Sequence, residues 1–133
     1  MLSEALTEPA GRIASMLRAR GDTVSVAEGS AGGLVSASLL SVPGASAYYV
    51  GGAVVYTFEA SREWMAGPVP VPDGMRGATE DFAMYLARSV SARLGTTWGL
   101  GEAGAAGPPN RYGDPAGHSW VAVTGPLLSL IHI

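Results

Sequence analysis

Apolar residues recur at helical spacing in two long segments of this chain. Residues 6–20 carry their apolar side chains on one face, and we expect Thr7 to cap this helix and Gly21 to end it in a left-handed conformation. Residues 79–94 repeat apolar side chains at every fourth position, behind a threonine and two acidic residues that favour a helix start. The pattern therefore predicts helices over 6–20 and 79–94.

The remaining predicted elements are shorter. β-Branched and aromatic residues bounded by glycine predict strands over 23–27, 52–56, 96–100 and 118–123. Two further helices are expected at 31–41 and 59–66, and loops rich in glycine and proline at 67–77 and 102–117. Strands that alternate with helices indicate a mostly parallel sheet covered by helices. The sequence thus predicts a three-layer α/β/α domain, an α/β fold that fills residues 1–127.

The last six residues, 128–133, differ in composition from the rest of the chain. Residues 1–127 contain one isoleucine, Ile13, whereas the tail contains Ile131 and Ile133. The tail also matches the translation of a transposase adapter used in sequencing libraries, so we interpret it as non-native and expect the natural protein to continue beyond position 127. The alternative is a genuine terminal strand, because the segment is rich in β-forming residues.

Composition and charge narrow the classes of function. Hydrophobic residues make up 47% and charged residues 14% of the 133, which is typical of a folded domain. No apolar run reaches the ~20 residues of a membrane-spanning helix, and the first residues lack the basic and apolar regions of a secretory signal. The net charge of −3 and the scattered arginines argue against a nucleic-acid surface. We expect a cytoplasmic protein without membrane or nucleic-acid partners. Whether it forms a homo-oligomer is left open by the sequence.

Two missing residue types limit the chemistry. The chain contains neither cysteine nor lysine, which excludes thiolate catalysis, a lysine base and a Schiff base. Its two histidines, His118 and His132, are too few for a multi-histidine metal site. We therefore expect no metal and no cofactor.

The first candidate motif, A-E-G-S-A-G-G-L, lies between the predicted strand 23–27 and the predicted helix 31–41. Its glycines let the backbone approach a ligand, the free amides at a helix start favour an anion, and Ser30 is placed to project into such a site. The alternative is that Ser30 only caps the helix and that the glycines serve packing. The predicted site residues here are Glu28, Gly29, Ser30, Ala31, Gly32 and Gly33.

Two later motifs are expected to complete the site. The second, G-G-A-V-V-Y-T-F-E-A-S-R, brings Tyr56 to a strand end, where its hydroxyl can bind a ligand or its ring can simply cover a sheet edge. The third is the glycine-rich stretch 101–114. It offers backbone amides and polar side chains suited to phosphate or carboxylate. The alternative for Arg111, the only cation in this stretch, is an ordinary solvated surface arginine. Its predicted site residues are Gly104, Gly107, Asn110 and Arg111.

These three motifs, in this order, resemble those of the CinA C-terminal family, the nicotinamide-nucleotide amidohydrolases. The family motifs read approximately A-E-S-C-T-G-G-L, G-G-x-V-x-Y-S-N-E-A-K and T-G-I-A-G-P-x-G-G, and the resemblance covers about residues 6–123. It implies a three-layer fold with a mostly parallel sheet and hydrolysis of the carboxamide of nicotinamide mononucleotide, which releases ammonia. The implied partner is a small phosphorylated ligand such as a pyridine mononucleotide.

The chain differs from the family at the positions to which the resemblance assigns catalytic roles. The family's catalytic serine and lysine align with Gly29 and Ser61, and its first-motif cysteine aligns with Ser30. Arg62, beside the lysine position, stays protonated at neutral pH and cannot act as a base. Ser30 is therefore the catalytic candidate, through a changed mechanism.

Three hypotheses follow. The first is an amidohydrolase of the nicotinamide-nucleotide type, and the second is a catalytically impaired relative that binds a nucleotide or acts as an interaction module. The third is a hydrolase that pairs Ser30 with His118. Without the family's serine and lysine, we expect amide hydrolysis to be weak or absent.

Overall fold

The computed structural model describes residues 1–127 and the backbone of residues 129–132. One five-stranded sheet, in the order β2-β1-β3-β4-β5, forms the centre of the domain. In chain order the elements are α1 (Glu4–Arg20), β1 (Val24–Glu28), α2 (Leu34–Leu40), the short 3-10 helix η1 (Ala45–Ala47), β2 (Tyr49–Val54), α3 (Phe58–Met65), α4 (Glu80–Leu94), β3 (Trp98–Ala105), β4 (His118–Thr124) and β5 (Ser129–His132).

The sheet is mostly parallel. Strand β1 pairs in parallel with both β2 and β3. Strand β4 is antiparallel to β3 and to β5, so β5 runs in the same direction as the first three strands. The predicted α/β fold with a mostly parallel sheet is therefore confirmed. Because β1, β2 and β3 point the same way, their carboxyl ends and the three motifs that follow them meet at one edge of the sheet.

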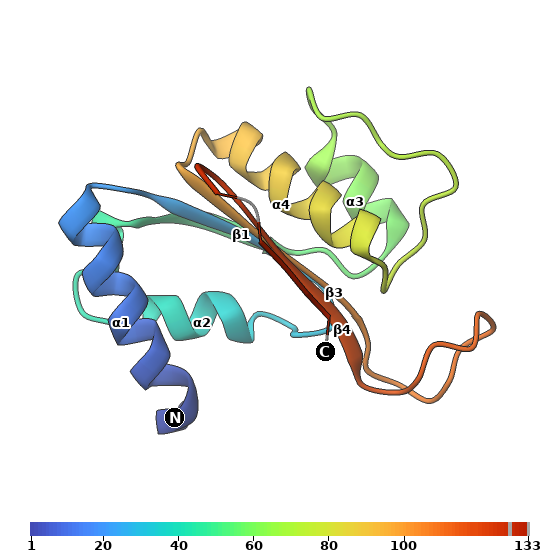
Figure 1. Cartoon of the computed structure of the whole chain (residues 1–133), viewed down its shortest axis with the longest axis horizontal. Coiled ribbons are helices and arrows are strands. Elements are labelled where there is room, and N and C mark those ends of the chain that lie inside the picture. Colours follow the sequence, from blue (N-terminus) through green and yellow to red (C-terminus); the bar gives the residue numbers. More distant parts are fainter. Residues whose placement is uncertain (128, 133) are drawn as a thin grey trace.

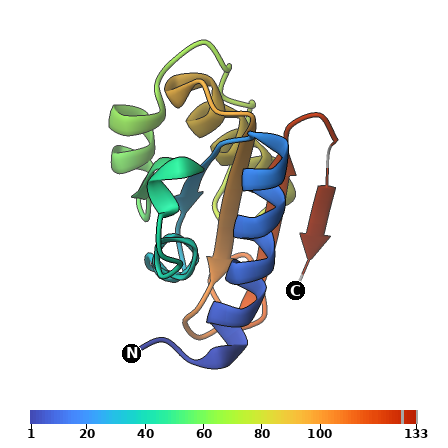
Figure 2. The same cartoon turned by 90° about the vertical axis from the view of Figure 1, so that its left-hand side faces the viewer.

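Helices cover both faces of the sheet (Figure 1). Helices α1 and α2 lie on one face, where their apolar side chains form a core with β1 and β3. Helices α3 and α4 lie on the other face and form the larger core. Figure 2, turned by 90°, shows α1 lying along the sheet and β5 at its edge. The layers are those expected of a three-layer α/β/α domain.

Glycines in β3 let α4 pack directly on the sheet. A Cβ atom at Gly99 would lie 2.1 Å from the carbonyl oxygen of Ala87, and one at Gly101 would lie 2.1 Å from that of Ala83. Any side chain at these two positions would force α4 away from the sheet. The prediction placed the end of this strand at position 100, but β3 extends to Ala105, so the predicted loop over 102–117 begins too early.

Helix boundaries show where sequence signals succeed and fail. The prediction that Gly21 ends α1 is confirmed, because Gly21 adopts a left-handed φ of 67°. The predicted Thr7 cap is wrong: α1 begins at Glu4, and the carbonyl of Ser3 accepts hydrogen bonds from the amides of Leu6 and Thr7. Helix α2 begins three residues later than predicted, because Gly32 and Gly33 both have positive φ angles.

The predicted non-native tail coincides with β5, whose backbone pairs with β4. Leu128 and Ile133 lie outside the described residues. A paired strand forms from any β-prone segment of suitable length, so the origin of the tail stays a prediction.

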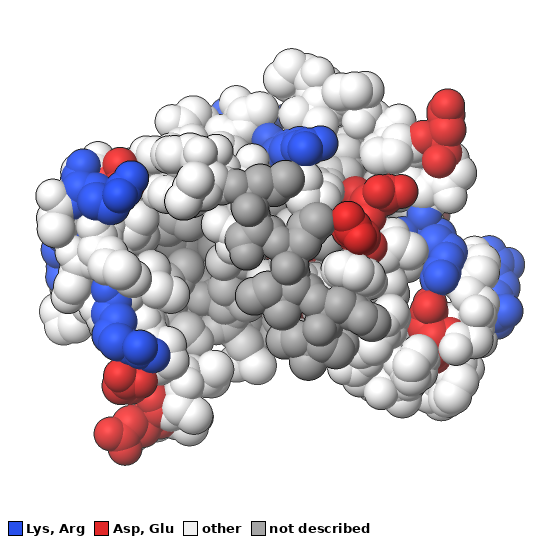
Figure 3. Space-filling model, in the orientation of Figure 1, with Lys and Arg blue, Asp and Glu red and all other residues white. Residues whose placement is uncertain are grey.

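No helix within the described residues is long and apolar enough to cross a membrane. On the face seen in Figure 3, arginines lie beside acidic side chains at the left and at the right of the view. Two such pairs are Arg12 with Glu8, at 3.1 Å, and Arg20 with Asp22, at 2.7 Å.

Candidate functional site

The three sequence motifs converge on one cavity of about 380 Å³. The first motif contributes Gly29 and Ser30, and the second contributes Val55 and Tyr56. The third motif forms the rest of the wall, together with residues that lead into α4. Its lining residues are Ala103, Gly104, Ala105, Ala106, Gly107, Pro108, Asn110 and Tyr112, and those next to or on α4 are Gly77, Ala78 and Phe82.

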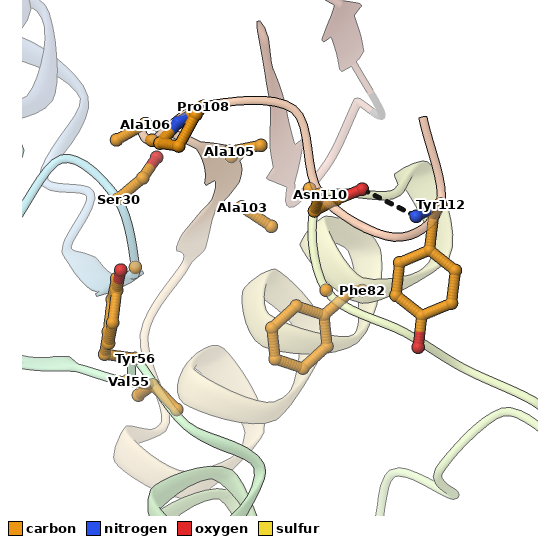
Figure 4. Close-up of a pocket in the computed structure, with 15 residues that line it drawn as sticks. Ser30, Val55, Tyr56, Phe82, Ala103, Ala105, Ala106, Pro108, Asn110 and Tyr112 are labelled. Carbon is orange, nitrogen blue, oxygen red and sulfur yellow. Dashed lines mark hydrogen bonds between the residues drawn. The ribbon is translucent and has the colours of Figure 1, made fainter. Parts of the chain in front are cut away.

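Aromatic side chains face each other across this cavity (Figure 4). Ser30 and Tyr56 lie on one side, Phe82 and Tyr112 lie on the opposite side, and Ala103 lies between them. None of the residues that line the cavity carries a formal charge. A small cavity with aromatic walls and a few polar groups suits a small planar ligand.

A buried carboxylate, that of Glu102 on β3, holds the first motif in place. Glu102 is 4% exposed, and its two oxygens accept four hydrogen bonds. Oε2 accepts from the backbone amides of Gly29, at 3.0 Å, and Ala31, at 2.9 Å. Oε1 accepts from the hydroxyls of Ser30, at 2.5 Å, and Ser119, at 2.7 Å. The only hydroxyl proton of Ser30 is therefore directed at Glu102.

A second buried carboxylate, that of Glu28, binds the start of α2. Glu28 is fully buried and pairs with Glu102 in the register of β1 and β3. Its Oε1 accepts from the amides of Gly33 and Val35, and its Oε2 accepts from the amide and the hydroxyl of Ser36. Glu28 was predicted as a ligand-binding residue, but it does not line the cavity. Its hydrogen bonds serve the helix start, where a negative charge is favourable.

The family model for the CinA C-terminal domain matches residues 6–131. This chain belongs to the CinA C-terminal domain family. A CinA-like protein of Acidobacterium capsulatum is 39% identical over 112 residues, covering 83% of this chain and 27% of that protein. One from Myxococcus xanthus is 37% identical over 111 residues, covering 83% and 26%. The chain thus spans about a quarter of the length of the curated relatives it matches.

Solved CinA structures share the fold over nearly the whole chain. The competence damage-inducible protein A from Klebsiella pneumoniae superposes with a TM-score of 0.87 at 25% identity, covering 96% of this chain and 81% of that one. The competence/damage inducible protein CihA from Agrobacterium tumefaciens gives a TM-score of 0.86 at 24% identity, covering 100% and 81%.

In the CinA-type first motif, four backbone amides already donate hydrogen bonds to groups of the protein itself. The amides of Gly29 and Ala31 donate to Glu102, that of Gly33 donates to Glu28, and that of Gly32 donates to the carbonyl of Gly29 at 3.0 Å. The sequence suggested that these amides would bind an anionic ligand. An incoming anion finds no free amide among these four, because two buried carboxylates and a carbonyl already accept from them. Ala31, Gly32 and Gly33 are also absent from the cavity lining.

Gly104 contributes to the CinA-type site by its lack of a side chain. A Cβ atom there would lie 2.3 Å from Ser30 Oγ and 2.9 Å from the carbonyl oxygen of His118. Such distances are far inside van der Waals contact. Glycine at this position therefore leaves the space that the Ser30 hydroxyl occupies.

Polar residues of the third motif bind one another around Asp114. The guanidinium of Arg76 donates to both Asp114 oxygens, at 2.5 and 3.2 Å, and the side-chain amide of Asn110 donates to Oδ2 at 3.0 Å. The hydrogen bonds from Arg76, followed by that from Asn110, lower the Asp114 pKa to about 2. Asn110 lines the cavity as predicted, and its carbonyl accepts from the amide of Tyr112 (Figure 4).

Arg111 lies beside the cavity without lining it. It is exposed, donates to the Tyr112 hydroxyl at 2.7 Å, and holds its guanidinium carbon 4.9 Å from the centre of that ring. The guanidinium of Arg76 lies 4.4 Å from the same ring centre. Two cations thus lie over an aromatic side chain that forms part of the cavity wall.

The remaining chemical candidates lie apart from the Ser30 hydroxyl. The imidazole of His118 lies 3.8 Å from Asp114, whereas the Ser30 proton is directed at Glu102, so the Ser30–His118 pairing is not the arrangement seen here. Ser61, which the sequence resemblance aligns with the family's lysine, is buried on α3, and neither it nor Arg62 lines the cavity.

Glu102 is the site residue that sequence reasoning missed. It was assigned to the start of a loop, where an acidic residue is ordinary. The alternation of Trp98 and Leu100 toward the α1 core continues to position 102, and this period of two is the signal for a buried side chain there.

Proposed function

We propose that this chain binds a small aromatic amide of the pyridine mononucleotide class in the three-motif cavity and hydrolyses it weakly or not at all. One observation carries the proposal. The three motifs of the CinA C-terminal family form the walls of a single cavity, but glycine stands at the family's serine position and the chain contains no lysine.

The walls of the cavity support a planar ring as the ligand. Tyr56 lies opposite Phe82 and Tyr112, and the space of about 380 Å³ is of the size that encloses one small heterocycle. Aromatic side chains stabilise such a ring by offset stacking or edge contacts. A carboxamide can be oriented at the wall by the hydroxyl of Tyr56 and by the Asn110 NH₂ group, which has a second hydrogen besides the one it donates to Asp114.

The phosphate of a mononucleotide would lie outside the first motif, because the amides of Gly29, Ala31, Gly32 and Gly33 already donate hydrogen bonds within the protein. Arg76 and Arg111 both lie over Tyr112, at the wall of the cavity. Arg76 is engaged by Asp114, so Arg111 is the better partner for a phosphate. A charge-assisted contact of this kind contributes about 1.5–3 kcal/mol.

Efficient hydrolysis of an amide needs an activated nucleophile and a donor for the leaving ammonia. Gly29 has no side chain, and Ser61 is buried away from the cavity. We expect ammonia release from nicotinamide mononucleotide to be far slower than in a family member that retains both residues.

Calorimetric titration with nicotinamide mononucleotide and nicotinate mononucleotide tests the binding. We expect Arg111→Ala to weaken binding roughly tenfold to hundredfold, as the loss of one charge-assisted contact does. Arg12→Ala, which removes an exposed arginine on α1, is the matched control and should bind as the parent does. Equal affinity in Arg111→Ala would remove this residue from the site, and no binding at millimolar ligand would overturn the proposal. Ammonia release at the rate of an intact family member would contradict the expected loss of activity.

A further inference from the structure

We infer that Ser30 and Glu102 form a nucleophile–base pair that transfers acyl groups from small uncharged aryl esters. This inference shares with the proposed function the cavity in which the ligand binds, and it depends on the proposed function in no other way. A hydroxyl becomes a useful nucleophile when a neighbouring group accepts its proton as it attacks. Ser30 lines the cavity, and its hydroxyl donates to Glu102 Oε1 at 2.5 Å.

The carboxylate is held rigidly in the orientation that this role requires. The amides of Gly29 and Ala31, on either side of Ser30, both donate to the Oε2 atom of Glu102. The Ser119 hydroxyl on β4 donates to Oε1. These three contacts fix the carboxylate plane, so Oε1 faces Ser30 without further rearrangement. A pair arranged before substrate arrives lowers the cost of reaching the transition state.

Access distinguishes this pair from a similar contact nearby. The Ser36 hydroxyl donates to the buried carboxylate of Glu28 at 2.8 Å, with much the same local geometry. Ser36 does not line the cavity, whereas Ser30 does. Of these two hydroxyls, that of Ser30 combines a buried carboxylate acceptor with a place on the cavity wall, where a reacting carbonyl can approach it.

The chemical step balances without any further group. Ser30 Oγ attacks the carbonyl carbon of an ester while its proton passes to Glu102 Oε1. The tetrahedral intermediate collapses, the bond from the carbonyl carbon to the leaving oxygen breaks, and Glu102 returns the proton to that oxygen. Water then attacks the acyl-Ser30 ester, gives its proton to Glu102, and releases the acid, after which the proton returns to Ser30. The aromatic wall of the cavity favours an aryl group on the substrate.

Glutamine at position 102 separates the chemical role of Glu102 from its structural role. Its amide oxygen can accept from Gly29 and Ala31, and its NH₂ group can donate to the two hydroxyls, because a hydroxyl both donates and accepts. Glu102→Gln therefore keeps the hydrogen-bond geometry while removing the proton acceptor.

Labelling with diisopropyl fluorophosphate, followed by intact mass and peptide mapping, tests the pair. In this reaction Ser30 Oγ bonds to phosphorus, fluoride leaves, and the hydroxyl proton passes to Glu102 and then to solvent. We expect one adduct on Ser30 in the parent chain and none in Ser30→Ala. We expect labelling to be roughly hundredfold slower or more in Glu102→Gln, with a melting temperature close to that of the parent. Ser36→Ala is the matched control and should label at the parent rate.

Several outcomes would overturn the inference. Labelling of Glu102→Gln at the parent rate would leave Glu102 a purely structural role, and absence of a Ser30 adduct in the parent would remove the nucleophile. If Glu102→Gln fails to fold, Gly104→Ala replaces it, because its methyl group would displace the Ser30 hydroxyl from its place beside Glu102, and labelling at the parent rate there would also overturn the pair. Labelling and mononucleotide binding are independent measurements. Loss of one with retention of the other shows which proposal has failed.

Discussion

Glu28 and Glu102 stand opposite each other in the pairing of β1 and β3, yet their surroundings give them different roles. Both are buried, and both accept four hydrogen bonds. Three donors to Glu28 are backbone amides and the fourth is the Ser36 hydroxyl, all at the start of α2. Glu102 accepts from two amides on one oxygen and two hydroxyls on the other. Glu28 therefore only stabilises the folded motif, whereas Glu102 also accepts a hydrogen bond from Ser30, whose hydroxyl lies at the cavity.

The largest expected effect follows from this difference in donors. Each oxygen of Glu28 faces at least one backbone amide, so Glu28→Gln must point its NH₂ group at an N–H group that cannot accept. We expect a loss of about 2–3 kcal/mol in the free energy of unfolding and a melting temperature lower by roughly 10 °C. Glu102→Gln should lose about 1 kcal/mol or less, because its NH₂ group can face two hydroxyls.

Thermal and urea unfolding followed by circular dichroism measures both variants. Glu63→Gln, which alters an exposed acidic residue on α3, is the control for loss of a carboxylate and should leave stability nearly unchanged. If Glu28→Gln and Glu102→Gln are equally destabilised, then the difference between amide and hydroxyl donors does not decide the role of each carboxylate.

Sequence reasoning reached the fold and the meeting of the three motifs at one cavity, but not this contrast. The parallel order of β1, β2 and β3 follows from alternating elements, and it alone brings the ends of the three motifs together. The role of Glu102 depends on contacts with Gly29, Ser30 and Ala31, which lie more than 70 positions away in the sequence. Local patterns carry no signal for which donors meet a given carboxylate. Likewise, the glycine-rich composition of residues 102–117 indicated a loop from position 102, whereas pairing with β4 continues the strand to Ala105.

A smaller effect is expected at Gly29, which joins the two carboxylate sites. A Cβ atom there would lie 3.3 Å from the carbonyl oxygen of Val55 and 3.5 Å from that of Glu102, so a side chain requires only a small shift. We expect Gly29→Ser to lower the free energy of unfolding by about 1 kcal/mol. It restores the hydroxyl implied by the family motif but no lysine, so ammonia release from nicotinamide mononucleotide should stay at the parent level. A large gain in ammonia release would show that glycine at position 29 alone accounts for the low activity.

The smallest effect concerns a third carboxylate, Asp114, which binds a cation instead of a helix start or a serine. Its contacts with Arg76 and Asn110 lower the pKa from the ordinary 3.8 to about 2. Because the folded-state pKa lies below the unfolded one, this contact stabilises the folded chain fully above about pH 4, and the contribution is lost as the pH falls toward 2. The melting temperature of Asp114→Asn should therefore lie below that of the parent near neutral pH, with a difference that shrinks between pH 4 and 2. Asp73→Asn, at an exposed position, controls for the general loss of negative charge. A difference that stays constant down to pH 2 would show that Asp114 acts through its shape and hydrogen bonds and not through its charge.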